Sequence, residues 1–307
     1  MQIDVIAPER FHGQIVLPAS NSISNRALVI HALSGGRQLI ENVSDCDDTW
    51  VMLRWLNGER QGEKDGVPVI DIGAAGTAMR FSSALLAVRD GECIITGTER
   101  MKHRPIGILV DALRTLGAQV DYVESEGFPP LHIVGNPRMA GGEVHLPGSV
   151  SSQYISALLM VGPMLERGLR LVLEGTIVSR PYIKMTIGIM RRFGAQVKWE
   201  PNHRSIVVAP GGYKAIPFVV ENDWSAASYW YEMVALSHDE QAEVVLPGLF
   251  TKSWQGDSGG AAVFERLGVR TDYVDGQMIL HKGRERVDHL EYDFVKMPDL
   301  AHTFVVT

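Results

Sequence analysis

The sequence has 307 residues, which is enough for two domains with sizeable cores. Hydrophobic residues make up 45% and charged residues 21% of it, which is typical of a globular protein. The formal net charge of −7 argues against a nucleic-acid-binding protein and against a basic membrane-surface protein.

The predicted elements follow one order along the chain. Apolar helices open with small or hydroxyl-bearing residues at 22–33, 75–86, 149–159 and 223–230. Strand-like runs follow at 93–97, 171–175 and 244–248, and later strands are expected at 131–134 and 205–208. In each repeat of this order a second helix lies between the earlier and the later strand. In the first repeat, which matches the others least well, this helix is predicted at 47–56. The order α-β-α-β-β, repeated, predicts an α/β protein whose helices pack against sheets.

A recurring helix end supports this repeat. Residues 111–120, 189–197 and 263–270 each read as the end of an amphipathic helix, a glycine and the start of a strand. The glycines are Gly117, Gly194 and Gly268, at intervals of 77 (194 − 117) and 74 (268 − 194) residues. A fifth copy begins at residue 298, and the sequence ends at Thr307 inside its first helix, so we expect a C-terminal truncation.

The helix starts carry the polar groups of interest. Free backbone N–H groups and the helix dipole make such a start an anion site, although one hydroxyl alone is more often a simple N-cap. Here the hydroxyls recur together with Arg26, Arg80 and Gln153, and the turn at 100–105 holds three further cations before a helix. Residues 179–182 occupy the same place in the next copy. The pattern therefore predicts a substrate with several negative charges.

Other site types and compartments lack support in the sequence. It has no dinucleotide fingerprint, Walker A lysine, nucleophile elbow or HExxH motif. Cys46 and Cys93 fit neither a disulfide framework nor a metal pattern, and we interpret them as small core residues. A signal peptide and an apolar run near the roughly 20 residues of a membrane span are also absent from the sequence, so a cytoplasmic protein is expected.

Five motifs resemble the 5-enolpyruvylshikimate-3-phosphate synthase family: residues 17–28, 75–80, 100–107, 148–153 and 179–183. The resemblance implies a two-domain, inside-out α/β barrel of repeated βαβαββ units, six in all. By this resemblance, residues 13–222 form a complete domain of three units, and residues 1–12 and 223–307 form an incomplete second domain.

The resemblance also implies the reaction. Members transfer the enolpyruvyl group of phosphoenolpyruvate to the 5-hydroxyl of shikimate 3-phosphate and release phosphate, by addition and then elimination, without a metal or organic cofactor. The implied partners are small anionic substrates, with no nucleic acid and no membrane, and a monomer is expected. Closure of two domains would exclude water from the site.

Residue roles carry over position by position. Ser22, Arg26, Ser151, Ser152, Gln153, Ser179 and Tyr182 would bind shikimate 3-phosphate, and Asp299 would lie at its reacting hydroxyl as the catalytic residue. Asn21, Gly76, Arg104 and Gln153 would lie on the phosphoenolpyruvate side.

The chain departs from the family pattern in three ways. Asn21 stands where the family has a lysine, which removes one full charge and would cost about a hundredfold in rate. Late family segments that carry an acid and several cations have no counterpart before Thr307, so weak activity or none is expected of these 307 residues. Ala74, where many members have asparagine, is a milder change.

Two alternatives remain open. The related UDP-N-acetylglucosamine enolpyruvyl transferases have a Lys-Asn motif and a reactive-loop cysteine, whereas Cys93 lies in a strand-like run. A binding protein that holds shikimate 3-phosphate without turning it over belongs to a different class.

Overall fold

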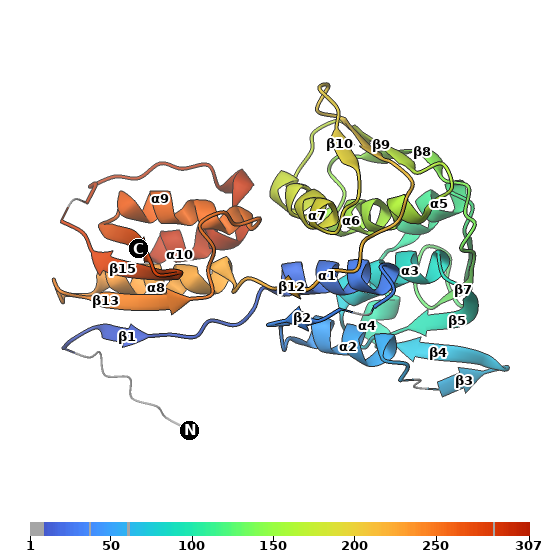
Figure 1. The fold of residues 1–307 in the computed structure, drawn as a ribbon, viewed down its shortest axis with the longest axis horizontal. Coiled ribbons are helices and arrows are strands. Elements are labelled where there is room, and N and C mark those ends of the chain that lie inside the picture. Colours follow the sequence, from blue (N-terminus) through green and yellow to red (C-terminus); the bar gives the residue numbers. More distant parts are fainter. Residues whose placement is uncertain (1–8, 37, 60–61, 285) are drawn as a thin grey trace. The chain divides into compact units, whose positions relative to one another are not determined.

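The computed structural model describes residues 9–36, 38–59, 62–284 and 286–307, and the chain divides into two compact units (Figure 1). We call residues 21–220 the large unit, and residues 1–20 with 221–307 the small unit. Each unit is described by itself.

The large unit repeats the order helix, strand, helix, strand, strand. The first copy consists of α1 (Asn21–Leu33), β2 (Ile40–Glu41), α2 (Asp47–Leu56), β3 (Gly62–Lys64) and β4 (Val67–Asp71). The second consists of α3 (Gly76–Ala87), β5 (Gly91–Thr96), α4 (Glu99–Lys102), α5 (Gly107–Thr115), β6 (Gln119–Tyr122) and β7 (Leu131–Gly135). After β8 (Gly142–Pro147), the third consists of α6 (Ser152–Val161), η1 (Gly162–Met164), β9 (Leu169–Glu174), α7 (Arg180–Arg192), β10 (Val197–Trp199) and β11 (Ser205–Val208), and β12 (Phe218–Val219) follows.

The sheets of the large unit share one pairing pattern. The two strands that flank a buried helix lie parallel, as β4 and β5 do around α3 and as β8 and β9 do around α6. The second of these strands then pairs antiparallel with the last strand of its copy, β7 or β11. In the first copy the parallel partner of β2 is β12, which is distant in sequence, so the end of the large unit pairs with its first copy.

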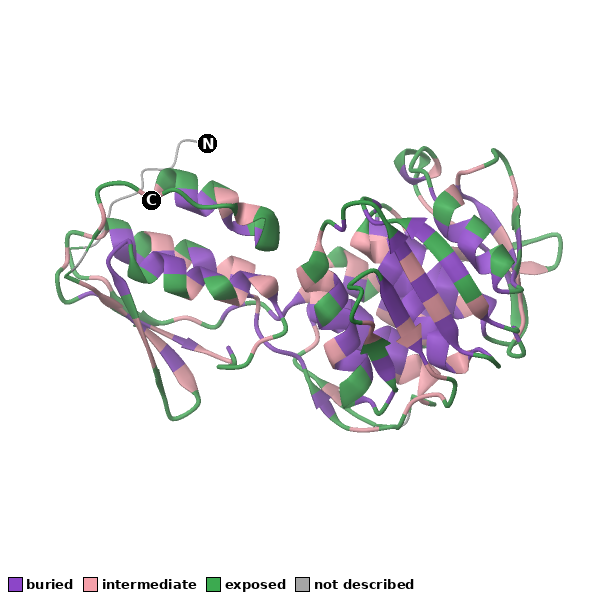
Figure 2. Cartoon of the chain, turned by 90° about the horizontal axis from the view of Figure 1, so that it is seen from above, coloured by how far each residue is buried: buried purple, intermediate pink, exposed green. Residues whose placement is uncertain are grey.

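Helices α1, α3 and α6 form the centre of the large unit, where they pack on one another. Nearly all residues of α3 and α6 are buried, which agrees with their lack of a polar face in the sequence. Buried residues follow the helices and strands, and exposed residues lie mainly in the connections (Figure 2). This arrangement, with apolar helices between outer sheets, confirms the predicted α/β fold class.

The small unit contains the fourth copy. Its elements are β1 (His12–Gln14), α8 (Trp224–Leu236), β13 (Glu243–Pro247), η2 (Gly256–Gly259), α9 (Gly260–Glu265), β14 (Val269–Val274), β15 (Gln277–Lys282), η3 (Phe294–Lys296), η4 (Pro298–Leu300) and α10 (Ala301–Val306). Strand β1 lies parallel to β13, and β15 pairs antiparallel with both β13 and β14. Because β1 pairs here, residues 13–20 lie with the small unit, and residues 221–222 also belong to it, whereas we expected both segments in the larger domain.

The three predicted glycine helix ends are confirmed, and the structure adds one short helix that the sequence did not predict. Gly117, Gly194 and Gly268 have φ values of 104°, 87° and 84°, a left-handed conformation that glycine adopts without strain. The segment at 100–105 was expected to be a turn, but its first half forms the short helix α4, because the Thr98 hydroxyl accepts a hydrogen bond from the Met101 amide.

Candidate functional site

Helices α1, α3, α6 and α7 of the large unit begin at the predicted polar segments, and the starts of the last three differ in their capping. At α6 the Ser151 hydroxyl accepts a 3.3 Å hydrogen bond from the Gln153 amide. At α3 the Thr77 amide donates at 2.9 Å to the Asp48 carboxylate, which comes from α2. At α7 Ser179 adopts φ +56° and makes no side-chain cap. A left-handed serine is a strained conformation that often marks a functional position.

Arg26 is the buried cation of the site, with only 3% of its surface exposed. Its Nε donates to Thr186 Oγ1 at 2.7 Å, Nη1 to the Ser22 carbonyl at 2.8 Å and Nη2 to Ser156 Oγ at 3.1 Å. Burial lowers the pKa of its guanidinium to about 10, and Tyr182 opposes that shift. The group therefore stays charged at neutral pH without a carboxylate among its hydrogen-bond partners.

Aromatic rings complete the surroundings of Arg26. The guanidinium carbon lies 5.3 Å from the centroid of the Phe81 ring and 5.9 Å from that of the Tyr182 ring. Ring faces stabilise a cation without neutralising it. Arg26 thus joins α1, α3, α6 and α7, and it keeps its charge available for an anionic ligand.

A second cationic group lies at the start of α3. Arg80 is 7% exposed and donates from Nη1 to the Gly76 carbonyl at 2.8 Å, while its Nε is buried without a hydrogen-bond partner. A Cβ atom on Gly76 would lie 2.5 Å from Arg104 Nη1 and 2.8 Å from Arg80 Nη1, so both guanidinium groups reach this backbone position. Burial and then the charge of Arg80 lower the pKa of Arg104. Two cations held side by side favour an anion between them.

Gln153 and Tyr154 connect this second group to α6. Gln153 Nε2 donates to Thr77 Oγ1 at 3.1 Å, and the Tyr154 ring lies 5.4 Å from the Arg80 guanidinium carbon. The Tyr154 hydroxyl donates to the Pro105 carbonyl at 2.6 Å, which anchors the residue that follows Arg104. Phe81, whose ring faces Arg26, is the neighbour of Arg80 in α3. The contacts around Arg26 and those around Arg80 are therefore connected through this helix.

Among the predicted residues, the structure links Ser22, Arg26, Tyr182, Gly76, Arg104 and Gln153 through the contacts given above. Asn21 begins α1, and its Oδ1 accepts a hydrogen bond from Asn25 Nδ2. Ser151 and Ser152 open α6, next to Gln153. Ser179 precedes α7, three residues before Tyr182. Their roles toward a substrate stay predictions.

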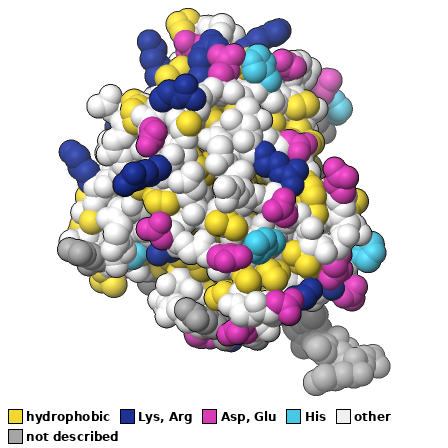
Figure 3. Space-filling model, turned by 90° about the vertical axis from the view of Figure 1, so that its right-hand side faces the viewer, with side chains coloured by type: hydrophobic (Ala, Val, Ile, Leu, Met, Phe, Trp, Pro, Cys, Tyr) yellow, Lys and Arg dark blue, Asp and Glu magenta, His cyan; other side chains and the backbone are white. Residues whose placement is uncertain are grey.

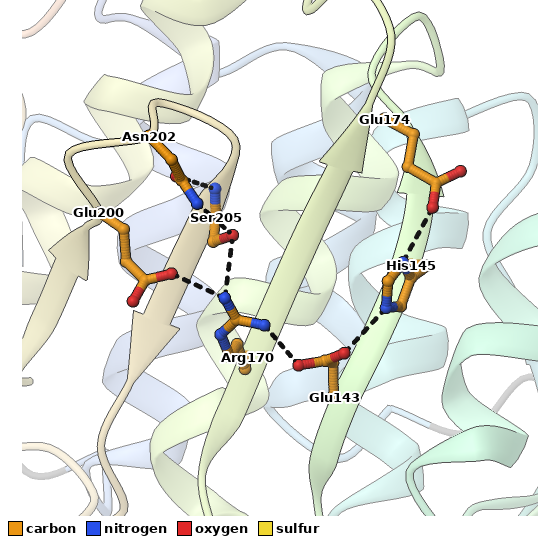
Figure 4. A network of polar contacts seen from close by, with 7 residues as sticks. All are labelled: Glu143, His145, Arg170, Glu174, Glu200, Asn202 and Ser205. Carbon is orange, nitrogen blue, oxygen red and sulfur yellow. Dashed lines mark hydrogen bonds and ion pairs between the residues drawn. The ribbon is translucent and has the colours of Figure 1, made fainter.

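Cations on the outer sheet face have different partners. In Figure 4, Arg170 on β9 contacts the carboxylates of Glu143 and Glu200, and His145 lies between Glu143 and Glu174. Acidic, basic and histidine side chains are also interspersed over the face drawn in Figure 3. By contrast, no described carboxylate forms an ion pair with Arg26 or Arg80. Arg26 and Arg80 therefore have no ion-pair partner among the described residues, whereas Arg104 feels the negative charge of Asp48.

Asp299 lies in the small unit, within η4, and it is exposed. It belongs to an acidic group around the start of α8. Asp223 caps that helix by accepting from the Ser225 and Ala226 amides at 2.7 and 3.2 Å, and the Ser225 hydroxyl donates to Asp257. Burial raises the pKa of Asp257 and the charge of Asp299 adds to that shift, so these two carboxyl groups lie near each other.

The Asp257 carboxyl provides a pH-dependent test of this group. Burial raises its pKa to about 6, against the hydrogen bond from Ser225. This carboxyl binds its proton more tightly in the folded state than in the unfolded state. The free energy of unfolding therefore falls as the pH rises from about 4 to about 6. Asp257→Asn should therefore raise the free energy of unfolding at pH 7 by at most about 3 kcal/mol and leave it unchanged at pH 4. Urea unfolding across this range measures the effect, and parallel wild-type and variant profiles would contradict it.

Gly76→Ala tests the second cationic group. The added methyl group would displace the Arg104 and Arg80 guanidinium groups, which are the ends of flexible side chains. The fold should therefore persist, while the KM for an anionic substrate bound at this group should rise about tenfold or more, because small displacements of charged groups weaken positioning strongly. Gly58→Ala is a control because nothing lies within 4 Å of its Cβ position, although its positive φ makes the change strained. Steady-state kinetics with an unchanged KM in Gly76→Ala would argue against this site.

Sequence reasoning missed several groups that build the site. Ser156 and Thr186 bind Arg26, and Asp48 caps α3, yet none of them was a candidate. The available signal was weak: Ser156 and Thr186 lie four residues after Ser152 and Tyr182, on the same faces of largely apolar helices.

Two further findings concern the described part of the chain alone. It contains no group of three or more His, Cys, Asp or Glu side chains arranged to hold a metal ion. Its helices are all too short or too polar to cross a membrane.

Comparisons with known proteins agree with the motifs. The family described as EPSP synthase (3-phosphoshikimate 1-carboxyvinyltransferase) matches residues 5–307. The chain is 56% identical over 301 residues to a 3-phosphoshikimate 1-carboxyvinyltransferase of Bacteroides fragilis, covering 98% of this chain and 71% of that protein. The protein of the same name from Sulfurovum sp. is 37% identical over 324 residues, covering 98% of this chain and 74% of that one.

A solved structure described as EPSP synthase from Acinetobacter baumannii resembles the fold, with a TM-score of 0.76 at 22% sequence identity. The similarity covers 96% of this chain and 70% of that one.

Proposed function

Because the chain belongs to the EPSP synthase family, we propose that it transfers the enolpyruvyl group of phosphoenolpyruvate to the 5-hydroxyl of shikimate 3-phosphate and releases phosphate. Both substrates are small anions, and the observation that supports the proposal best is the pair of cationic groups around Arg26 and Arg80. The 5-oxygen adds to C2 of phosphoenolpyruvate as its methylene carbon takes a proton. Loss of that proton and departure of phosphate then restore the double bond, so positioned cations and an acid–base pair suffice.

Shikimate 3-phosphate is assigned to the start of α1, α6 and α7. Arg26 and Ser22 would bind the shikimate part, while Ser151, Ser152, Ser179 and Tyr182 would bind its phosphate and ring. The support is electrostatic: two helix starts and a buried cation favour a phosphate near Tyr182.

Phosphoenolpyruvate is assigned to the start of α3, with Gly76, Arg104, Gln153 and Asn21. Gln153 would contact both substrates, since it opens α6 and donates to Thr77 at the start of α3. We further propose that Asp299, from the small unit, accepts the proton of the 5-hydroxyl.

Asn21 should limit the rate of the chain. An amide donates hydrogen bonds but lacks the full charge of the lysine that the family has there. We expect Asn21→Lys to raise kcat/KM for phosphoenolpyruvate about a hundredfold, because it would restore a charge-assisted contact in the transition state. An equal or lower value in the variant, measured beside the wild type, would show that Asn21 does not limit the reaction.

The proposed reaction is tested by measuring phosphate release in the presence of both substrates. Omission of shikimate 3-phosphate should abolish release, and UDP-N-acetylglucosamine should not replace it. The 307-residue chain is compared with a chimera that adds the part of the Bacteroides fragilis relative outside the matched 71%. The proposal would be contradicted if neither protein released phosphate. In that case, calorimetry that shows binding of shikimate 3-phosphate would identify the chain as a binding protein without turnover.

Two expectations remain proposals. A cytoplasmic location is checked by cell fractionation, and a monomer by sedimentation of the purified protein.

A further inference from the structure

A line of hydrogen bonds runs from α2 to the first residue of α1. Thr49 Oγ1 donates to Asn25 Oδ1 at 2.8 Å, and Asn25 Nδ2 donates to Asn21 Oδ1. Cys46 Sγ lies 3.3 Å from the Thr49 hydroxyl. Asn25 and Thr49 are 0% exposed, so water does not compete for these groups. We call this line the amide relay.

The amide relay has a direction. The Thr49 hydroxyl has one proton, and because that proton goes to Asn25, the Cys46 thiol is the donor in the contact between Cys46 and Thr49. In the structure the Asn25 carboxamide turns its oxygen to Thr49 and its NH2 group to Asn21. Asn21 receives this bond on its oxygen, so its own NH2 group points away from the relay.

The relay ends at the proposed phosphoenolpyruvate side. Thr49 is adjacent in α2 to Asp48, whose carboxylate accepts the Thr77 amide at the start of α3. Thr77 in turn accepts from Gln153, and its neighbour Gly76 lies against the Arg104 guanidinium. Helices α1 and α3 are thus both tied near their starts to neighbouring residues of α2, α1 through Asn25 and Thr49 and α3 through Thr77 and Asp48.

We propose that Thr49 and Asn25 are positioning residues that hold the Asn21 carboxamide with its NH2 group toward the anionic groups of phosphoenolpyruvate. The inference rests on the proposed function. An unrestrained carboxamide can turn either its donor or its acceptor end toward an anion, and the acceptor end repels it. A fixed direction therefore lets a neutral side chain act as an anion ligand where the charge of a lysine is missing.

The kinetic test compares Thr49→Val with Thr49→Ser. Valine keeps the shape but removes the hydroxyl, so Asn25 is no longer fixed and the KM for phosphoenolpyruvate should rise by about two- to tenfold. The KM for shikimate 3-phosphate should stay unchanged, and Thr49→Ser should behave as the wild type. Equal values of the KM for phosphoenolpyruvate in Thr49→Val and Thr49→Ser would overturn the proposal.

A spectroscopic test does not depend on turnover. In 15N-labelled full-length protein, the side-chain NH2 signals of Asn21 are identified by their loss in Asn21→Asp. Titration with inorganic phosphate should shift these signals in the wild type and in Thr49→Ser, and shift them less in Thr49→Val. Absence of a shift in the wild type would overturn the inference even if phosphate release is observed. If the signals shift but no phosphate is released from the substrates, the amide relay is supported and the proposed function is wrong.

Discussion

Replacing Arg26 by methionine is expected to weaken shikimate 3-phosphate binding about a hundredfold or more, because a buried charge-assisted contact is lost. The fold should persist. Arg26 is buried and bonded only to hydroxyl and carbonyl groups, so its charge carries a desolvation cost that methionine removes. The melting temperature should therefore stay level or rise while affinity falls.

Calorimetry with shikimate 3-phosphate and thermal unfolding together measure this result. Arg170→Met is the matched control, since that arginine is half-exposed on the outer sheet and already bound to Glu143 and Glu200. The control should bind as the wild type does. If Arg26→Met kept wild-type affinity, the assignment of shikimate 3-phosphate to this cluster would be wrong.

Asp299→Asn is expected to lower kcat about a hundredfold or more, because positioned general bases contribute on this scale. The amide keeps the size of the side chain and cannot accept the proton of the 5-hydroxyl. Affinity for shikimate 3-phosphate, which the large unit is proposed to supply, should change little.

The measurement is single-turnover phosphate release at saturating substrate concentrations. Asp272→Asn is the control, because Asp272 is a half-exposed carboxylate of the small unit that forms ion pairs with Arg270 and His281. A kcat for Asp299→Asn within a few-fold of that control would exclude Asp299 as the base.

Much of the fold follows from local signals. The glycine ends at 117, 194 and 268 and the second helix at 47–56 are set by backbone conformation and periodicity within a few residues. The short α4 was missed because a single Thr98 cap decides between a turn and a helix. The membership of residues 13–20 was missed because it depends on β1 pairing with β13, more than two hundred residues away.

The site was predictable only in part, for a related reason. Arg26 and Gln153 stand at helix starts, where the sequence displays them beside hydroxyls. Ser156 and Thr186 lie inside apolar helices, and only the packing of α1 against α6 and α7 turns them toward Arg26. The orientation of Asn21 depends likewise on Thr49, which belongs to a different helix.

A crystal structure of the chain with shikimate 3-phosphate tests the central claim most directly. The account predicts the ligand at the starts of α6 and α7, with its phosphate near Ser179 and its ring within hydrogen-bond reach of Arg26. A fully occupied ligand bound elsewhere on the large unit, with the Arg26 guanidinium untouched, would contradict it.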